Sequence, residues 1–228
     1  MSHTVPVAAG KPLAVPTRVA LAGVFAALIA VCSMLPPVPV GGFGVPITLQ
    51  TFAVMLTGLV LGARLGFLSV LLYVVVGLAG LPVFSGFSAG FGVLAGPTAG
   101  YLLAFPFAAG LAGALSSLVL KRGRIAAARG AGGDVGGDAL EGAGRARSAG
   151  RMGFRWWALV WLSAMVGSFV FIHPLGIGGM MIALDLDFST AVAADMVFWP
   201  GDVIKNVLAT AVTATVVRAF PALALRRF

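Results

Sequence analysis

The stretch VALAGVFAALIAVCSML (residues 19–35) carries no charge and only one hydroxyl group. It is longer than the apolar region of a signal peptide, about 7–15 residues, and it runs into PPVP (36–39) rather than into a small-residue cleavage site. Because about 20 mostly apolar residues cross a bilayer as a helix, the stretch predicts a retained membrane-spanning helix.

The rest of the chain repeats this pattern. Hydrophobic residues make up 60% of the 228 residues and charged residues only 10%, whereas about a quarter of the residues in a soluble domain are charged. No charged residue occurs in 19–63, 65–120 or 156–184, and each gap has room for one or two helices. The sequence therefore predicts an all-α integral membrane protein. Its six transmembrane helices are expected at 18–35, 47–63, 65–81, 98–120, 156–176 and 200–218.

The basic residues indicate how these spans are oriented. Lys and Arg are missing from the loops at about 36–46, 82–97 and 177–199, and they gather in the other loops and both tails. By the positive-inside rule, both termini are expected in the cytoplasm. We therefore expect a membrane domain over 18–220. Cytoplasmic tails over 1–17 and 221–228 would flank it.

The loop over 121–155 is rich in Gly, Ala and Arg and has no hydrophobic periodicity. This composition predicts a flexible cytoplasmic linker whose charges set the topology. Attraction to anionic lipid or to a protein partner is the alternative. The net charge of +8 is thus explained by topology and gives no reason to expect a nucleic-acid partner.

Two of the outer loops are uncharged and rich in glycine, with aromatic residues between the glycines. They contain GGFGVP (41–46) and SGFSAGFG (85–92). Non-helical backbone at membrane depth is tolerated where it is buried in protein or lines a cavity. The loops are therefore interpreted as lids over a cavity, with ordinary tight turns as the alternative.

Two charges interrupt the last apolar stretch, FWPGDVIKNVL (198–208). Asp202 and Lys205 lie three positions apart, so a helix places them on one face. A carboxylate is favoured in the first turn of a helix, which explains Asp202 but not the lysine. Asn206, Thr210 and Thr213 extend the pair into a polar stripe, which we expect to face the bundle interior. An ion pair between Asp202 and Lys205 would lower its cost.

The site is expected to open to the outside. Lys205 lies about five residues from the start of its helix, roughly 8 Å at 1.5 Å per residue. In the second span, Thr48 and Gln50 fall at a similar depth, and the Gln50 amide can both donate and accept hydrogen bonds. The sequence therefore predicts a polar pocket reached from the outer surface.

Other functional motifs are missing or weak. No G-x-x-x-x-G-K-[ST] motif occurs, so the chain is not itself a P-loop ATPase. Cys32 is the only cysteine, which argues against an intrachain disulfide and cysteine metal chemistry. GFSAG (86–90) has the G-x-S-x-G pattern around Ser88, but that motif needs an α/β sheet. His173, followed by Pro174, is interpreted as an interfacial or packing histidine.

The first span carries a ridge of small residues, Ala22, Ala26 and Ala30, with Gly23 and Ala27 beside them. Surfaces of this kind let helices approach closely. Packing within this chain and contact with another membrane subunit are the two explanations.

Four motifs together resemble the BioY family, the biotin-specific S components of energy-coupling-factor transporters: VPITLQT (45–51), GLPVF (80–84), GPTAGYL (96–102) and PGDVIK (200–205). The resemblance covers the chain except for the N-terminal tail and the expanded loop over 121–155. It implies the S-component fold in a prokaryotic cell membrane. Binding of biotin from the outside would be followed by transport with a transmembrane coupling subunit (T component) and two ATP-binding-cassette ATPases.

The resemblance also implies roles for single residues. The family's Asp and Lys match Asp202 and Lys205 and are expected to bind biotin, and the alanine ridge resembles the feature that contacts the coupling subunit. The chemistry of biotin suggests further candidates for binding it. Gln50, Thr48 and Asn206 would supply neutral hydrogen bonds, and Phe43, Phe87 and Tyr101 could cover its ring system.

These expectations describe a binding subunit, neither an enzyme nor a protein with a cofactor or metal. A self-sufficient carrier that uses Asp202 as a proton site is the alternative, although no inverted repeat is evident. An intramembrane hydrolase centred on Ser88 is a third hypothesis.

Overall fold

The computed structural model describes residues 13–40, 42–131 and 153–220, and within these ranges the regular elements are helices. One isolated antiparallel bridge joins Val38 to Ile47. The longer helices are α1 (Val15–Met34), α2 (Gln50–Leu61), α3 (Ala63–Leu78), α4 (Ala99–Ala131), α6 (Phe154–Gly167), α7 (His173–Leu184), α8 (Phe188–Met196) and α9 (Trp199–Ala219). Shorter helical turns are η1 (Ser85–Phe87), η2 (Phe91–Ala95) and η3 (Ser168–Ile172). The predicted all-α class is confirmed.

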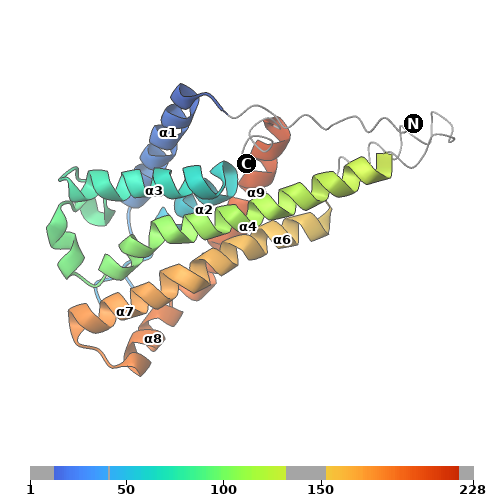
Figure 1. The fold of residues 1–228 in the computed structure, drawn as a ribbon. Helices are drawn as coiled ribbons and strands as arrows, with labels where there is room; N and C mark the ends of the chain where they lie inside the picture. The colour runs from blue at the N-terminus through green and yellow to red at the C-terminus, as the bar shows by residue number, and fades with distance from the viewer. Residues whose placement is uncertain (1–12, 41, 132–152, 221–228) are drawn as a thin grey trace.

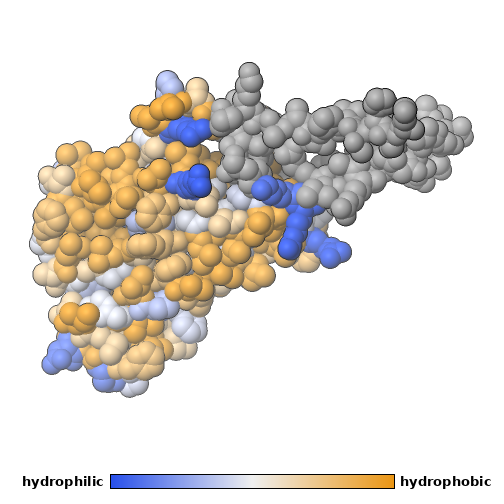
Figure 2. Space-filling model, in the orientation of Figure 1, coloured by the Kyte–Doolittle hydropathy of each residue, from blue (hydrophilic) through white to orange (hydrophobic). Residues whose placement is uncertain are grey.

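The surface of the described residues is largely apolar, as expected for a protein that faces lipid. Many large apolar side chains are exposed, and they cover most of the face in Figure 2. Three described helical segments are long and apolar enough to cross a membrane: Val15–Met34, Ala99–Arg122 and Phe154–Leu184. α2 and α3 are apolar but shorter. The six-span count stays a prediction.

α4 lies at the centre of the bundle and packs against α2, α3, α6 and α7, while α9 packs against α2 and α6 (Figure 1). Small residues allow these close approaches. A Cβ added at Gly58 would lie 2.3 Å from the carbonyl oxygen of Ala109, and one at Gly100 would lie 1.9 Å from that of Leu175. In a membrane the hydrophobic effect does not drive helices together, because lipid is itself apolar. Small residues let the helix backbones approach closely, and van der Waals packing then stabilises the pair.

The fifth span is longer than predicted. α6, η3 and α7 form one helical rod from Phe154 to Leu184 with a π-helical turn inside it. Pro174 cannot donate the usual backbone hydrogen bond within a helix, and the π turn, in which the His173 N–H bonds to the Ser168 carbonyl, accommodates it. The expected loop over 177–199 is therefore wrong: α7 occupies its first part and α8 most of the remainder.

α4 is also longer than the span predicted over 98–120, because it continues from the membrane segment to Ala131. The linker expected over 121–155 therefore does not begin at 121, and α6 has begun by Phe154. Alanine, arginine and lysine have high helix propensity, which explains why the helix continues past 121. The rest of this loop and most of both tails lie outside the described residues.

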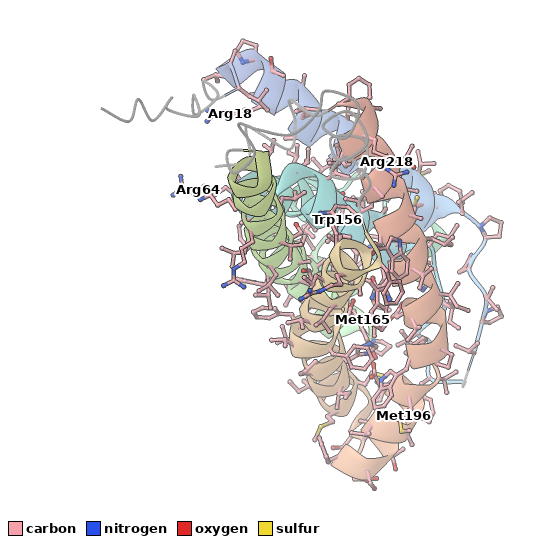
Figure 3. All side chains as sticks on the ribbon, turned by 90° about the vertical axis from the view of Figure 1, so that its right-hand side faces the viewer. Arg18, Arg64, Trp156, Met165, Met196 and Arg218 are labelled. Carbon is pink, nitrogen blue, oxygen red and sulfur yellow. The ribbon has the colours of Figure 1, made fainter. Side chains whose placement is uncertain are left out.

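Charge separates along the bundle. Arg18, Arg64 and Arg218 lie at one end and Met196 lies at the other (Figure 3). The start of α6 and the end of α9 share the basic end (Figure 1). The acidic residues Asp185 and Asp187 flank the link from α7 to α8 at the opposite end.

Candidate functional site

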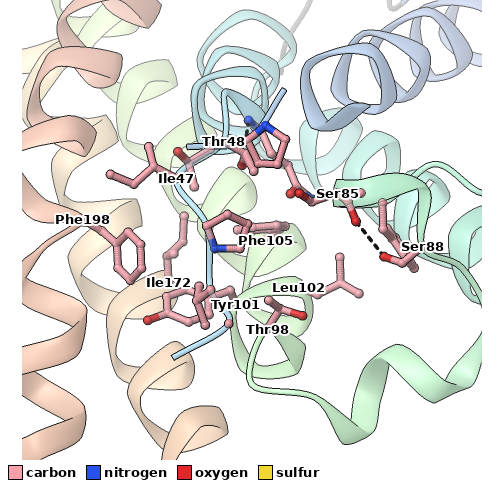
Figure 4. Close-up of a pocket in the computed structure, with 18 of the residues that line it drawn as sticks. Ile47, Thr48, Ser85, Ser88, Thr98, Tyr101, Leu102, Phe105, Ile172 and Phe198 are labelled. Atoms are coloured by element: carbon pink, nitrogen blue, oxygen red, sulfur yellow. Dashed lines mark hydrogen bonds between the residues drawn. The ribbon is translucent and has the colours of Figure 1, made fainter. Parts of the chain in front are cut away.

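A cavity of about 330 Å³ lies between the glycine-rich loops and the ends of α2, α4 and α9 (Figure 4). This volume is at the small end of the range of small-molecule sites, about 300–1,000 Å³. Both uncharged loops contribute to its wall, which supports their interpretation as covers of a cavity. The lining residues are Pro37, Gly44, Val45, Pro46, Ile47, Thr48, Gln50, Thr51, Phe84, Ser85, Gly86, Ser88, Val93, Thr98, Tyr101, Leu102, Phe105, Ile172, Phe198, Asp202 and Lys205.

The charged pair forms one wall of this cavity. Lys205 Nζ lies 3.1 Å from Asp202 Oδ1 and donates to Thr51 Oγ1 at 3.0 Å, while the Thr51 hydroxyl lies 3.0 Å from the same Asp202 oxygen. Lys205 and Asp202 are only 9% and 4% exposed. An ammonium has three donors and a carboxylate about four acceptor sites, so both groups keep hydrogen-bonding capacity for a ligand. The predicted ion pair is confirmed.

The polar stripe of α9 faces inward, as predicted. Asn206, Thr210 and Thr213 are all buried. Asn206 does not line the cavity, because its amide nitrogen lies 3.2 Å from Ser168 Oγ and 3.3 Å from Met165 Sδ. The two threonine hydroxyls donate to backbone carbonyls one turn earlier. The deeper part of the stripe therefore serves helix contacts.

Gln50 and Thr48 both reach the cavity. The Gln50 amide nitrogen donates to the Tyr73 hydroxyl at 2.9 Å, and that hydroxyl lies 3.1 Å from Ser33 Oγ. Among the described residues, the Gln50 carbonyl oxygen has no donor, so it can accept a hydrogen bond from a ligand. The backbone N–H of Gln50 donates to Thr48 Oγ1 at 3.3 Å, which leaves the Thr48 hydroxyl proton for a ligand.

Tyr101 presents its ring to the cavity and packs edge-on against Phe198, with 6.0 Å between ring centroids. Its hydroxyl is directed elsewhere and donates to Asp195 Oδ1 at 2.7 Å. Trp199 Nε1 donates to the other oxygen of the same carboxylate at 2.8 Å. Tyr101 therefore offers its ring face, rather than its hydroxyl, to the cavity.

The polar network around the site contains residues that sequence reasoning missed. Thr51 lies three residues after Thr48, in the first turn of α2, and that spacing could have revealed it. Asp195 is fully buried, and His173 lies between it and Asp202. A lone carboxylate in an apolar stretch was the available signal. The described residues hold no group of three or more His, Cys, Asp or Glu side chains arranged for a metal ion.

The remaining predicted aromatics lie away from the cavity. Phe87 has a positive φ of 59° and is 61% exposed. Phe43 lines a second, shallower hollow against α8, together with Ala194 and Val197. The Ser88 hydroxyl donates to the Ser85 carbonyl (Figure 4) and has no described contact with a base.

The alanine ridge of α1 faces partly inward. Ala26 is 9% exposed, Ala22 and Ala30 are half-buried, and Ala30 packs against the core. Gly23 and Ala27 beside them are exposed. Packing within the chain therefore explains Ala26.

Comparison with known proteins agrees with this geometry. The BioY family model matches residues 8–222. Biotin transporter BioY of Rhizobium etli is 34% identical over 90% of this chain and 96% of its own length, and the Rhodobacter capsulatus protein of the same name is 36% identical over 92% and 98%. The crystal structure of the S-component for biotin from an ECF-type ABC transporter shares the fold, with a TM-score of 0.68 over 91% of this chain and 92% of that chain at 24% identity. The chain belongs to the BioY family.

Proposed function

We propose that this chain is the biotin-binding S component of an energy-coupling-factor transporter. The observation that carries the proposal is the contact of buried Asp202 and Lys205 with the half-buried Thr51 in the wall of an otherwise largely apolar cavity. Ionised side chains at membrane depth are costly and usually mark a substrate or ion pathway. The identity of the proposed ligand, biotin, comes from the named relatives, which are biotin transporters.

The site matches the chemistry of biotin, which has an apolar bicycle, a ureido group with two N–H donors and a carbonyl, and an anionic valerate chain. Tyr101 and Phe198 offer ring surfaces for the bicycle. Asp202 and the Gln50 carbonyl accept from N–H groups, and Lys205 and Thr48 donate. Two orientations satisfy these groups, with Lys205 on either the ureido carbonyl or the carboxylate. Asn206, Phe43 and Phe87 would then act indirectly or as the loops close.

We further propose six membrane spans with both termini in the cytoplasm. The basic end formed by α1, α3, α6 and α9 supports this orientation. α9 carries charge, but its outward face holds Ile204 and Leu208, both exposed and apolar. The cavity would then open toward the outside, near the acidic end of the bundle.

ATP-driven transport would need ATPase subunits besides this chain, because its sequence has no P-loop. We propose a transmembrane coupling subunit and two ATP-binding-cassette ATPases in the plasma membrane of a prokaryote. The accessible parts of Ala22 and Ala30, with Gly23 and Ala27 beside them, are the proposed contact with the coupling subunit.

Calorimetry on the purified full chain tests biotin binding. Saturable binding to the wild type that is lost in Asp202→Asn supports the proposal, with Ile204→Ala as the control from the exposed face of the same helix. No saturable binding by the wild type overturns it. Proteoliposomes without ATPase subunits separate the alternative, because uptake driven by a proton gradient alone would identify a self-sufficient carrier.

A further inference from the structure

His173 is a buried histidine behind the wall of the cavity, and it is not among the residues that line it. It opens α7 directly after the π turn and is 3% exposed. The rings of Phe169 and Trp199 cover it, with centroid distances of 4.5 Å and 6.0 Å. A group placed in this way reaches a ligand only through its neighbours.

Its two ring nitrogens both face carboxylates. Nδ1 lies 2.8 Å from Asp195 Oδ2, and Nε2 lies 3.6 Å from Asp202 Oδ2. Neither nitrogen makes an aligned hydrogen bond with the described residues. A neutral imidazole has one N–H and one lone pair, so it would direct its lone pair at one of the two carboxylates. Only the imidazolium carries a proton on both nitrogens and so offers positive charge to both carboxylates.

Charge balance points the same way. Besides His173, the buried ionised groups of the described chain are Asp195, Asp202 and Lys205, so two negative charges face one positive charge. The fourth titratable neighbour, Tyr101 of α4, donates its hydroxyl proton to Asp195 and is neutral. A buried charge without a partner is costly, and a protonated His173 would make the cluster neutral.

We propose that His173 is a positioning residue that is protonated in the ligand-binding state, where it links Asp195 to Asp202. Its charge offsets Asp195, so that Lys205 is not needed to balance two carboxylates and can attract an anionic ligand. Its Nε2 faces one oxygen of Asp202, Oδ2, while Thr51 and Lys205 contact the other, Oδ1. The inference rests on the proposed function, because the ligand anion is the carboxylate of biotin.

The proposal predicts affinity that depends jointly on pH and on ligand charge. Loss of the His173 proton leaves a buried negative charge near the ligand, and one unit charge a few ångströms away changes affinity at least about tenfold. Wild-type affinity for biotin should fall by at least that factor between about pH 5.5 and about pH 8.5. Affinity for biotin methyl ester, which is uncharged, should change less than about threefold.

Calorimetry on the full-length protein with both ligands makes the test, with three variants. His173→Gln should bind biotin as weakly at every pH as the wild type does at high pH. His173→Gln/Asp195→Asn removes the uncompensated charge as well, so it should regain at least about tenfold in biotin affinity without pH dependence. His3→Gln is the matched control, because the chain has only two histidines.

The outcomes separate the two proposals. If the wild type binds no biotin at any pH, the proposed function fails. If it binds biotin and His173→Gln keeps the wild-type pH profile, the positioning role is overturned. If His173→Gln binds neither ligand, the double variant decides: recovered biotin binding supports the charge role, whereas no recovery refutes it.

Discussion

Asp202 and Lys205 form an ion pair across one turn of α9, with 3.1 Å between Nζ and Oδ1, in the wall of a cavity within the membrane domain. Its members come from a single helix, so helix geometry alone brings them together. The hydroxyl of Thr51 on α2 contacts both and ties the pair to a second helix. Four predictions follow from this site and the helices around it.

Removal of one member of the pair should be worse for the fold than removal of both. Lys205→Met leaves Asp202 buried without its main counterion, a loss of about 3–5 kcal/mol in stability. Asp202→Asn/Lys205→Met should melt at a higher temperature than the single lysine variant, and both should lose at least about a hundredfold in biotin affinity. Thermal melting in detergent and calorimetry measure the two effects. Equal melting of the single and double variants would contradict the prediction.

Thr51 should contribute to ligand affinity through its hydroxyl. Thr51→Val keeps the shape and removes a hydrogen bond to each charged group, and such bonds are worth about 1.5–3 kcal/mol. We expect biotin affinity to fall about 10- to 100-fold in calorimetry. Thr51→Ser keeps the hydroxyl and should stay within about threefold of the wild type. A serine variant as weak as the valine variant would show that the methyl group matters instead.

Gly176 should be required for the position of the Tyr101 ring. A Cβ at Gly176 would lie 2.1 Å from Tyr101 Cε1, so Gly176→Ala must displace the ring that lines the cavity. We expect at least about tenfold weaker biotin binding, since overpacking typically costs about 1–3 kcal/mol. Gly178→Ala is the matched control on α7, because no atom lies within 4 Å of its added Cβ. Equal binding by the two variants would refute this role for Gly176.

Asp187 should hold the start of α8 in a pH-dependent way. Hydrogen bonds from Ser189 and Thr190 hold the pKa of Asp187 below its usual range. Since the folded pKa is lowered, the stabilisation is complete above the unfolded value of about 3.9 and is lost as pH falls through the folded value. Hydrogen exchange of the α8 amides should rise in Asp187→Ala at neutral pH. Asp185→Asn serves as the control, and no change in Asp187→Ala would contradict the capping role.

Local patterns were enough to predict much of the site. Uncharged runs predicted the long apolar helices, because a bilayer requires about the same apolar length from each span. Spacing of three placed Asp202 and Lys205 on one face, and the cost of buried charge turned that face inward. Gln50, Thr48 and Tyr101 also reach the cavity, since they begin the helices beside it.

Other features depended on neighbours distant in sequence. The fifth span was expected to end at 176, but the π turn accommodates Pro174 and α7 continues to Leu184. Phe43 and Phe87 do not line the cavity, because the loops direct these side chains elsewhere. His173 looked like a packing residue because its two carboxylate neighbours come from α8 and α9.

The sequence by itself determined the all-helical membrane class and the inward-facing charged pair, because both follow from hydropathy and from the helical repeat. Only the tertiary structure decided which groups complete the site. Thr51 lies 151 residues from Asp202, and Tyr101 lies 94 residues from Asp195. Pairing over such separations depends on how helices pack, and here small residues such as Gly100 and Gly176 set that packing by letting α4 and α7 approach closely.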